Sequence, residues 1–203
     1  MNNLKAVGIL GSITKSNGVE TNSEELLGEL LRKIRGEGVS AEMVKLGDLN
    51  FEHGMNAEMN DDFKTVINAV LGADIVVWAT PIHWGMPSSL IVKTIERMNS
   101  IDDGYLETGK NPLKDKVAGM VVVGHEDGMQ HVVGMLSNAL LWYGFCLPPQ
   151  CITYWVGEMG QPFEQDVEKR RSNEETKRIT KVAAENLVAY AKMIKVSKTQ
   201  SLT

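Results

Sequence analysis

The chain has 203 residues and a formal net charge of −5, with 43% apolar and 23% charged residues. These values predict a single globular domain over residues 1–203, with a frayed end at 197–203. The acidic balance argues against a nucleic-acid partner. No apolar stretch approaches the roughly 20 residues of a membrane span, and two cysteines do not make a disulfide framework. A cytoplasmic location is therefore the expectation.

Short apolar runs alternate with segments of helical periodicity along the whole chain. The runs are typical of strands covered on both faces, and they lie at 4–10, 41–46, 74–80, 117–123 and 151–156. The helical patterns lie at 26–34, 63–71, 88–98, 132–141 and 179–194. This alternation predicts a doubly wound parallel sheet.

Two segments carry no clear periodicity. We expect an irregular connection over 101–115 and a polar excursion over 157–171. The mixed charges between Glu164 and Arg178 are typical of a solvated helical face.

In an open α/β sheet, ligands bind at the loops that leave the carboxyl ends of strands. The first such loop, 11–23, is rich in hydroxyl and carboxamide side chains and leads into a helix, where free N–H groups favour a phosphate. It matches neither the P-loop nor the dinucleotide glycine motif. A polar turn ending in a helix cap explains it equally well, and Asn22 with Glu25 has capping-box spacing. The candidate phosphate ligands are Ser12, Lys15, Ser16, Asn17, Thr21 and Asn22.

The second loop follows the third apolar run and combines aromatic, proline and glycine residues. A planar ligand needs apolar walls and nearby hydrogen-bond donors, and this loop offers both. The alternative makes Trp84 a core residue and His83 a surface residue. The candidates are Pro81, Ile82, His83, Trp84 and Gly85.

The third loop is bracketed by two glycines, which let the backbone approach a ligand closely. A metal site built on His125 and Glu126 lacks a known ligand spacing and is disfavoured. We expect Asp127 to cap the following helix. The candidates are Gly124, His125, Glu126, Asp127 and Gly128.

These loops resemble those of the NADPH-dependent FMN reductase and flavodoxin-like family, which includes quinone reductases and iron–sulfur flavoproteins. The resemblance spans residues 4–155 and departs from the family at His83, where a Tyr is usual. The first loop is slightly longer than usual, and the cysteines of an iron–sulfur cluster are absent. The residues that carry the resemblance are Gly11-Ser12, Thr21-Asn22-Ser23, Thr80-Pro81-Ile82-His83-Trp84-Gly85, and Lys93 before Glu96-Arg97.

The resemblance implies a flavodoxin-like three-layer α/β sandwich with a five-stranded parallel sheet in the order 2-1-3-4-5. It implies FMN and NAD(P)H as cofactors, with the FMN phosphate in the first loop and its ring between the second and third. The implied activity is hydride transfer from NAD(P)H through FMN to a quinone, free flavin or similar small acceptor. Because the chemistry belongs to the cofactor, no side chain is assigned as catalytic.

Two other functional classes stay open at this point. One is a flavodoxin-type electron carrier without its own NAD(P)H reductase activity. The other is a flavin-free scaffold, should FMN not bind.

Large apolar side chains near loops and helix ends, together with the resemblance, predict a homodimer or a dimer of dimers. The alternative is that Trp142 and Phe145 fill the core. The apolar segments are Met86-Pro87, Tyr105-Leu106 and Trp142-Tyr143-Gly144-Phe145.

Overall fold

The computed structural model describes residues 4–14, 20–55, 60–125 and 127–200. The strands are β1 (Lys5–Leu10), β2 (Ser40–Lys45), β3 (Ile75–His83), β4 (Met86–Pro87), β5 (Val117–Gly124) and β6 (Ile152–Val156). The helices are α1 (Asn22–Gly36), the short 3₁₀ helix η1 (Leu46–Asp48), α2 (Phe63–Gly72), α3 (Ser89–Arg97), α4 (Asn99–Thr108), α5 (Met129–Trp142), α6 (Phe163–Ser172) and α7 (Glu174–Gln200).

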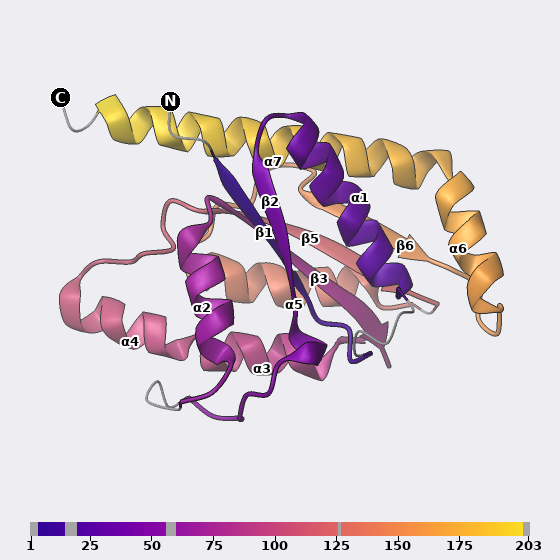
Figure 1. Ribbon diagram of the computed structural model, residues 1–203, viewed down its shortest axis with the longest axis horizontal. Coiled ribbons are helices and arrows are strands. Elements are labelled where there is room, and N and C mark those ends of the chain that lie inside the picture. Colours follow the sequence, from indigo (N-terminus) through magenta and orange to yellow (C-terminus); the bar gives the residue numbers. More distant parts are fainter. Residues whose placement is uncertain (1–3, 15–19, 56–59, 126, 201–203) are drawn as a thin grey trace.

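Five strands pair in parallel in the order β2-β1-β3-β5-β6, and the two-residue β4 pairs antiparallel with β3. Apart from the extra β4, this is the predicted order 2-1-3-4-5. Helices α1 and α7 lie on one side of the sheet, and α2, α3 and α5 lie on the other (Figure 1). The flavodoxin-like three-layer sandwich is therefore confirmed.

The central strands are apolar throughout because helices cover both of their faces. Every residue of β5 is buried. In β1, Ala6 and Leu10 point into the core beneath α1 and α7, whereas Val7 and Ile9 point into the core beneath α2, α3 and α5. Side chains alternate across a strand, so one continuous apolar run supplies both cores. Burying each such side chain stabilises the fold by about 1.5–3 kcal/mol.

Helices α4 and α6 occupy segments that we expected to be irregular or polar. Helix α4 has no buried residue and ends at Gly109 in the left-handed conformation (φ 69°), so apolar periodicity gave no sign of it. Helix α6 buries Asp166, Val167 and Arg170. The expectation of a solvated face is therefore wrong for this helix, because its inward stripe is mostly polar.

Helix α7 continues to Gln200, whereas we expected a frayed end from residue 197. Its amino-terminal half is tied to the sheet by a buried hydrogen bond of 2.7 Å between the hydroxyls of Thr180 and Thr153. None of the described helices is both long enough and apolar enough to cross a membrane.

Arg97, at the end of α3, fixes the connection that precedes α2. Its side chain is buried and pairs with Asp61 at 3.1 Å, donates to the Glu52 carbonyl at 3.3 Å, and stacks over the ring of Phe63. Burial acts to raise the pKa of the Asp61 carboxyl. Hydrogen bonds from the backbone N–H groups of Glu52 and Phe63, together with the charge of Arg97, outweigh burial and lower this pKa from its usual value.

Replacing Arg97 by Met is expected to lower the free energy of unfolding by about 1–3 kcal/mol at neutral pH, because charged hydrogen bonds are lost. The folded-state pKa of Asp61 lies below its unfolded value, so this pairing stabilises the protein above that unfolded value. The contribution disappears as the pH falls through the folded-state pKa. Urea denaturation should show a smaller difference in unfolding free energy between the wild type and Arg97→Met at pH 3 than at pH 7. The exposed Lys110→Met is the control, and an equal deficit at both pH values would contradict this account.

Candidate functional site

The first loop leaves β1 along the carboxyl edge of the sheet. Gly11 donates its N–H to the Ala79 carbonyl of β3 at 2.7 Å. Ser12 is buried, and its hydroxyl accepts from the N–H of Thr14 at 3.3 Å, so the loop turns directly after the strand. Of the predicted phosphate ligands, Lys15, Ser16 and Asn17 lie outside the described residues.

The loop ends at the capped amino terminus of α1. Thr21 is the cap, and its hydroxyl accepts from the N–H of Glu24 at 3.2 Å, so the cap lies one residue before the predicted Asn22–Glu25 pair. Asn22 is buried and donates to Asp166 of α6 at 2.5 Å, while its carboxamide oxygen accepts from Arg170. The Asn22 side chain, which we predicted to bind a phosphate, is therefore hydrogen-bonded to Asp166 and Arg170 instead.

The second segment is a β-hairpin rather than a loop. Strand β3 continues through Pro81 and Ile82 to His83, which pairs with Met86 of β4. The two turn residues, Trp84 and Gly85, both have positive φ (53° and 73°), the geometry of a two-residue hairpin turn that follows the twist of its strands. The side chain of Trp84 is 92% exposed, so the core alternative for this residue is wrong.

The third segment brings the end of β5 against this hairpin. Gly128 begins α5 with φ 121°, and a Cβ placed on it would lie 2.7 Å from the Cα of Gly85. No side chain caps α5, so the prediction that Asp127 is a helix cap is wrong. Glu126 lies outside the described residues. The hairpin and the third loop are therefore packed backbone to backbone at the carboxyl edge of the sheet.

A cavity of about 700 Å³ opens at this edge, within the range of small-molecule sites. Sequence reasoning named three of the lining residues but missed those that follow β6. Their position after the carboxyl end of a strand was the available signal. The cavity is lined by Trp84, His125, Asp127, Val156, Gly157 and Met159.

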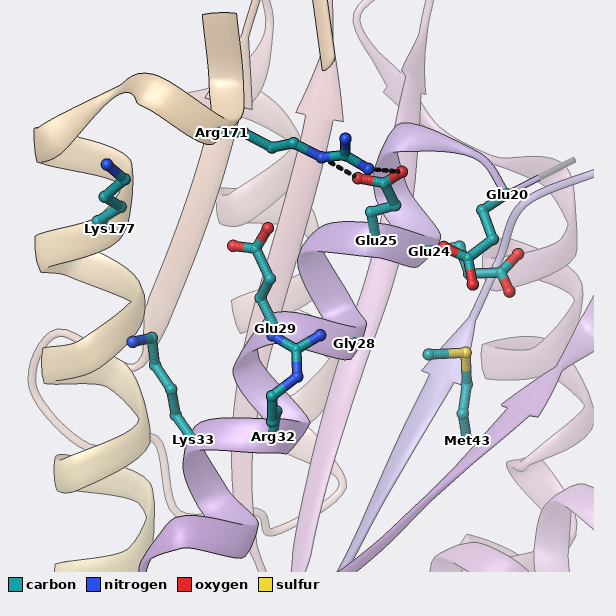
Figure 2. A pocket seen from close by; sticks show the side chains of 10 residues that line it. All are labelled: Glu20, Glu24, Glu25, Gly28, Glu29, Arg32, Lys33, Met43, Arg171 and Lys177. Carbon is teal, nitrogen blue, oxygen red and sulfur yellow. Dashed lines mark hydrogen bonds and ion pairs between the residues drawn. The ribbon is translucent and has the colours of Figure 1, made fainter. Parts of the chain in front are cut away.

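A second hollow, of about 680 Å³, runs along α1 and is lined by charged side chains of both signs. Figure 2 shows that the carboxylate of Glu25 accepts two hydrogen bonds from the guanidinium of Arg171. Arg32 and Lys33 lie further along α1, the helix that carries Glu25. The charged groups neutralise one another on the helix surfaces, and Met43 is the one apolar side chain among the described lining residues, too little for the two walls of a planar ring. We therefore place the candidate site at the cavity beside Trp84.

The profile of the NADPH-dependent FMN reductase family matches residues 4–157. The chain belongs to this family. The predicted resemblance is thereby confirmed, and family membership implies FMN and NAD(P)H as cofactors.

Individual relatives agree with this assignment. The 8-demethyl-8-aminoriboflavin-5'-phosphate synthase of Streptomyces davaonensis is 30% identical over 168 residues, which cover 77% of this chain and 65% of the synthase. The chain thus spans slightly under two thirds of that relative's length. RosB, solved with bound 8-demethyl-8-formylriboflavin-5'-phosphate, has a TM-score of 0.85 and 27% identity, covering 95% of this chain and 80% of RosB. The apo form of the NADH:FMN oxidoreductase EMOB shares the fold, with a TM-score of 0.66 and 14% identity over 91% of this chain and 88% of EMOB.

The residues present at the carboxyl edge fit an FMN. The Ser12 hydroxyl lies in the turn after β1, and the Thr21 hydroxyl lies at the first turn of α1, where free N–H groups suit a phosphate. The close backbone contact of Gly128 with Gly85 leaves main chain beside the cavity, where a flat ring can approach it.

Replacing Gly128 by Ala is expected to weaken FMN binding by about tenfold or more, equivalent to at least 1.4 kcal/mol. The new Cβ would clash with Gly85 and strain a backbone at φ 121°, and so would push the hairpin away from the third loop. Fluorescence titration with FMN measures the change. Gly104→Ala is the matched control, because a Cβ there meets open space. Equal FMN affinity in the two variants would contradict the proposed packing of the site.

Proposed function

We propose that the protein is an NAD(P)H oxidoreductase that uses FMN to reduce a small acceptor such as a quinone or free flavin. The observation that carries this proposal is the cavity beside Trp84 and His125, at the sheet edge of an FMN reductase family member. Bound FMN supplies the hydride chemistry that links NAD(P)H to the acceptor. The protein supplies binding, orientation and exclusion of water.

The FMN phosphate is assigned to the first loop and the ring to the opposite side of the site. Ser12, Lys15, Ser16, Asn17 and Thr21 are the proposed phosphate ligands, supported by the hydroxyl-rich turn at the amino end of α1. The side chain of Asn22 leaves this set because α6 engages it.

The ring is assigned to the cavity that the hairpin, residues 81–85, and the third loop, residues 124–128, line together through Trp84, His125 and Asp127. The exposed indole of Trp84 provides an apolar face for the ring or an incoming substrate. Met159, also exposed, extends that apolar wall on the side of β6. A small acceptor can diffuse into a cavity that is open to solvent beside both residues. This favours the enzyme over an electron carrier that exchanges electrons only with other proteins.

Stopped-flow mixing of the FMN-loaded protein with NADPH or NADH separates the enzyme from the carrier. We expect at least one nucleotide to bleach the flavin absorbance, and a subsequent addition of a benzoquinone to restore it. Protein without added nucleotide is the control for photoreduction. Failure of both nucleotides to bleach the bound flavin would favour the electron carrier and reject the enzyme.

A second candidate is chemistry on the flavin itself. It is favoured by the likeness to RosB, whose structure holds a modified flavin phosphate, and by the synthase relative with 30% identity. Mass spectrometry of flavin extracted after aerobic incubation with FMN tests it. An unchanged mass, with NAD(P)H oxidation intact, would leave the reductase as the function.

We also propose a homodimer that uses an apolar surface on α4 and α5. Leu106, Leu141 and Trp142 are largely exposed there, beside a shallow hollow of about 270 Å³ between the two helices. Phe145 does not belong to this surface, because it is buried against Trp78 with the rings edge to face. Exposed apolar patches of this kind mark interfaces in water-soluble proteins.

Light scattering is expected to give the wild type twice the chain mass of 22.4 kDa. Leu106→Glu and Trp142→Glu should shift the protein toward the monomer, because they bury charge in the interface. Met193→Glu is the control, since Met193 is also an exposed apolar residue but lies on α7. A monomeric wild type that binds FMN and retains reductase activity would refute the dimer.

A further inference from the structure

A buried carboxylate on α6 holds the imidazole that lines the cavity. Asp166 is fully buried, and one of its oxygens accepts from the indole N–H of Trp155 at 2.8 Å. The other oxygen accepts from the Asn22 carboxamide at 2.5 Å and contacts Nε2 of His125 at 2.9 Å. Three donors from three different segments therefore converge on one carboxyl group.

The main chain of Gly157 closes this arrangement. A Cβ at this position would lie 2.0 Å from Oδ1 of Asp166 and 2.9 Å from Cδ2 of His125. Only a residue without a side chain lets the strand end approach the carboxylate and the imidazole together. The contact between His125 and Asp166 is thus enforced by the backbone that leaves β6.

The surroundings favour an ionised carboxylate. A buried carboxylate is stable when several N–H groups donate to it. Arg170, also buried, reaches the same cluster through Asn22. Its remaining nitrogens pair with Glu25 and Glu29, each at 2.8 Å, so the guanidinium charge is balanced by α1. The charge of Asp166 is therefore matched chiefly by the dipoles that point at it and by His125.

This geometry fixes how the imidazole carries its protons. Because Nε2 donates to Asp166, the neutral ring keeps its proton on Nε2, and the proton that the imidazolium can release is the one on Nδ1. The His125 side chain is 42% exposed and lines the cavity, so it reaches both a ligand and solvent. A buried carboxylate that orients a partly exposed imidazole is a recurrent way to position a general acid.

We propose that His125 is the proton donor to the reduced acceptor and that Asp166 is its positioning residue. The inference rests on the proposed reductase function. NAD(P)H gives up a hydride, the acceptor gains that hydride's two electrons and its proton, and the Nδ1–H of His125 supplies the second proton. For a quinone the sum is NAD(P)H + H⁺ + quinone → NAD(P)⁺ + hydroquinone. His125 then recovers its proton from water, while Asp166 keeps its contact with Nε2.

Asp166 lies outside residues 4–157, to which the family profile matches. The carboxylate that orients His125 is thus contributed by a helix beyond the matched region. Among the described residues, the titratable groups near the imidazole are Asp166 from α6 and Asp127 from its own loop. The other described residues that line the cavity are uncharged: Trp84, Val156, Gly157 and Met159.

The tautomer of His125 is the first test, and it needs neither flavin nor nucleotide. Nitrogen NMR of ¹⁵N-histidine-labelled protein at pH 8 should show the neutral ring of His125 protonated on Nε2. Asp166→Asn should abolish that preference, whereas Trp155→Phe should keep it. A wild-type ring protonated on Nδ1 would overturn the proposal. If Asp166→Asn does not fold, the wild-type tautomer and the His125 variant below still decide the matter.

The second test compares two acceptors in the FMN-loaded protein. Reduction of a benzoquinone needs protons at the acceptor, whereas ferricyanide takes up electrons alone. His125→Gln should lower the ratio of the quinone rate to the ferricyanide rate by about 10²-fold, the low end for general acid catalysis. The loss should fall on kcat rather than KM, with FMN affinity changed less than twofold. His131→Gln, an exposed histidine on α5, is the matched control.

The outcomes separate cleanly. A wild type that oxidises NAD(P)H, with an unchanged acceptor ratio in His125→Gln, would overturn the role of His125 and leave the proposed function standing. A wild type that oxidises no NAD(P)H with either acceptor would overturn the proposed function, and the role of His125 with it. A lowered ratio together with the Nε2 tautomer supports both.

Discussion

The carboxylate of Asp166 is the constraint on which the ligand edge of this protein depends. It joins the start of α1, the loop after β5, the strand β6 and the helix α6 through hydrogen bonds to Asn22, His125 and Trp155. A buried charge without these donors would cost several kcal/mol. The four segments are therefore interdependent, because displacing any one of them leaves the carboxylate short of a partner. Rigidity at the cavity follows from a polar network in the protein interior rather than from apolar packing.

The fold was accessible from sequence because the sheet strands are apolar on both faces. The runs that contain Val7, Val77 and Val121 are stable only where both faces of the sheet are covered, and the alternating helical segments fix the parallel order. The same reasoning missed α6, since hydrophobic periodicity cannot recognise a helix that buries Asp166 and Arg170. It also missed α4, whose residues are exposed or only partly buried and which therefore lacks an apolar stripe.

Sequence reasoning predicted which loops form the candidate site but not the hydrogen bonds between their side chains and the rest of the protein. The three strand-end loops do meet at one edge, as the topology requires. Sequence reasoning could not foresee that the Asn22 side chain bonds to α6, because Asn22 and Asp166 are 144 positions apart and no local pattern encodes their pairing. It also missed the hairpin turn at Trp84, where a bulky residue takes a positive φ. Polar residues in a helix look the same in a sequence whether they face water or one another.

The hairpin turn at Trp84 has a consequence for how the protein responds to its ligands. A bulky residue in the left-handed region costs about 1–3 kcal/mol, and an indole that is 92% exposed returns none of the usual benefit of burial. In the free protein, the backbone conformation of Trp84 therefore lowers the stability of the folded state, and burial of the indole does not offset this cost. A ligand that covers the indole binds only the folded chain, and its stabilising effect grows with the logarithm of its concentration. If the proposed flavin or substrate covers Trp84, the thermal tolerance of this protein rises with the supply of that ligand.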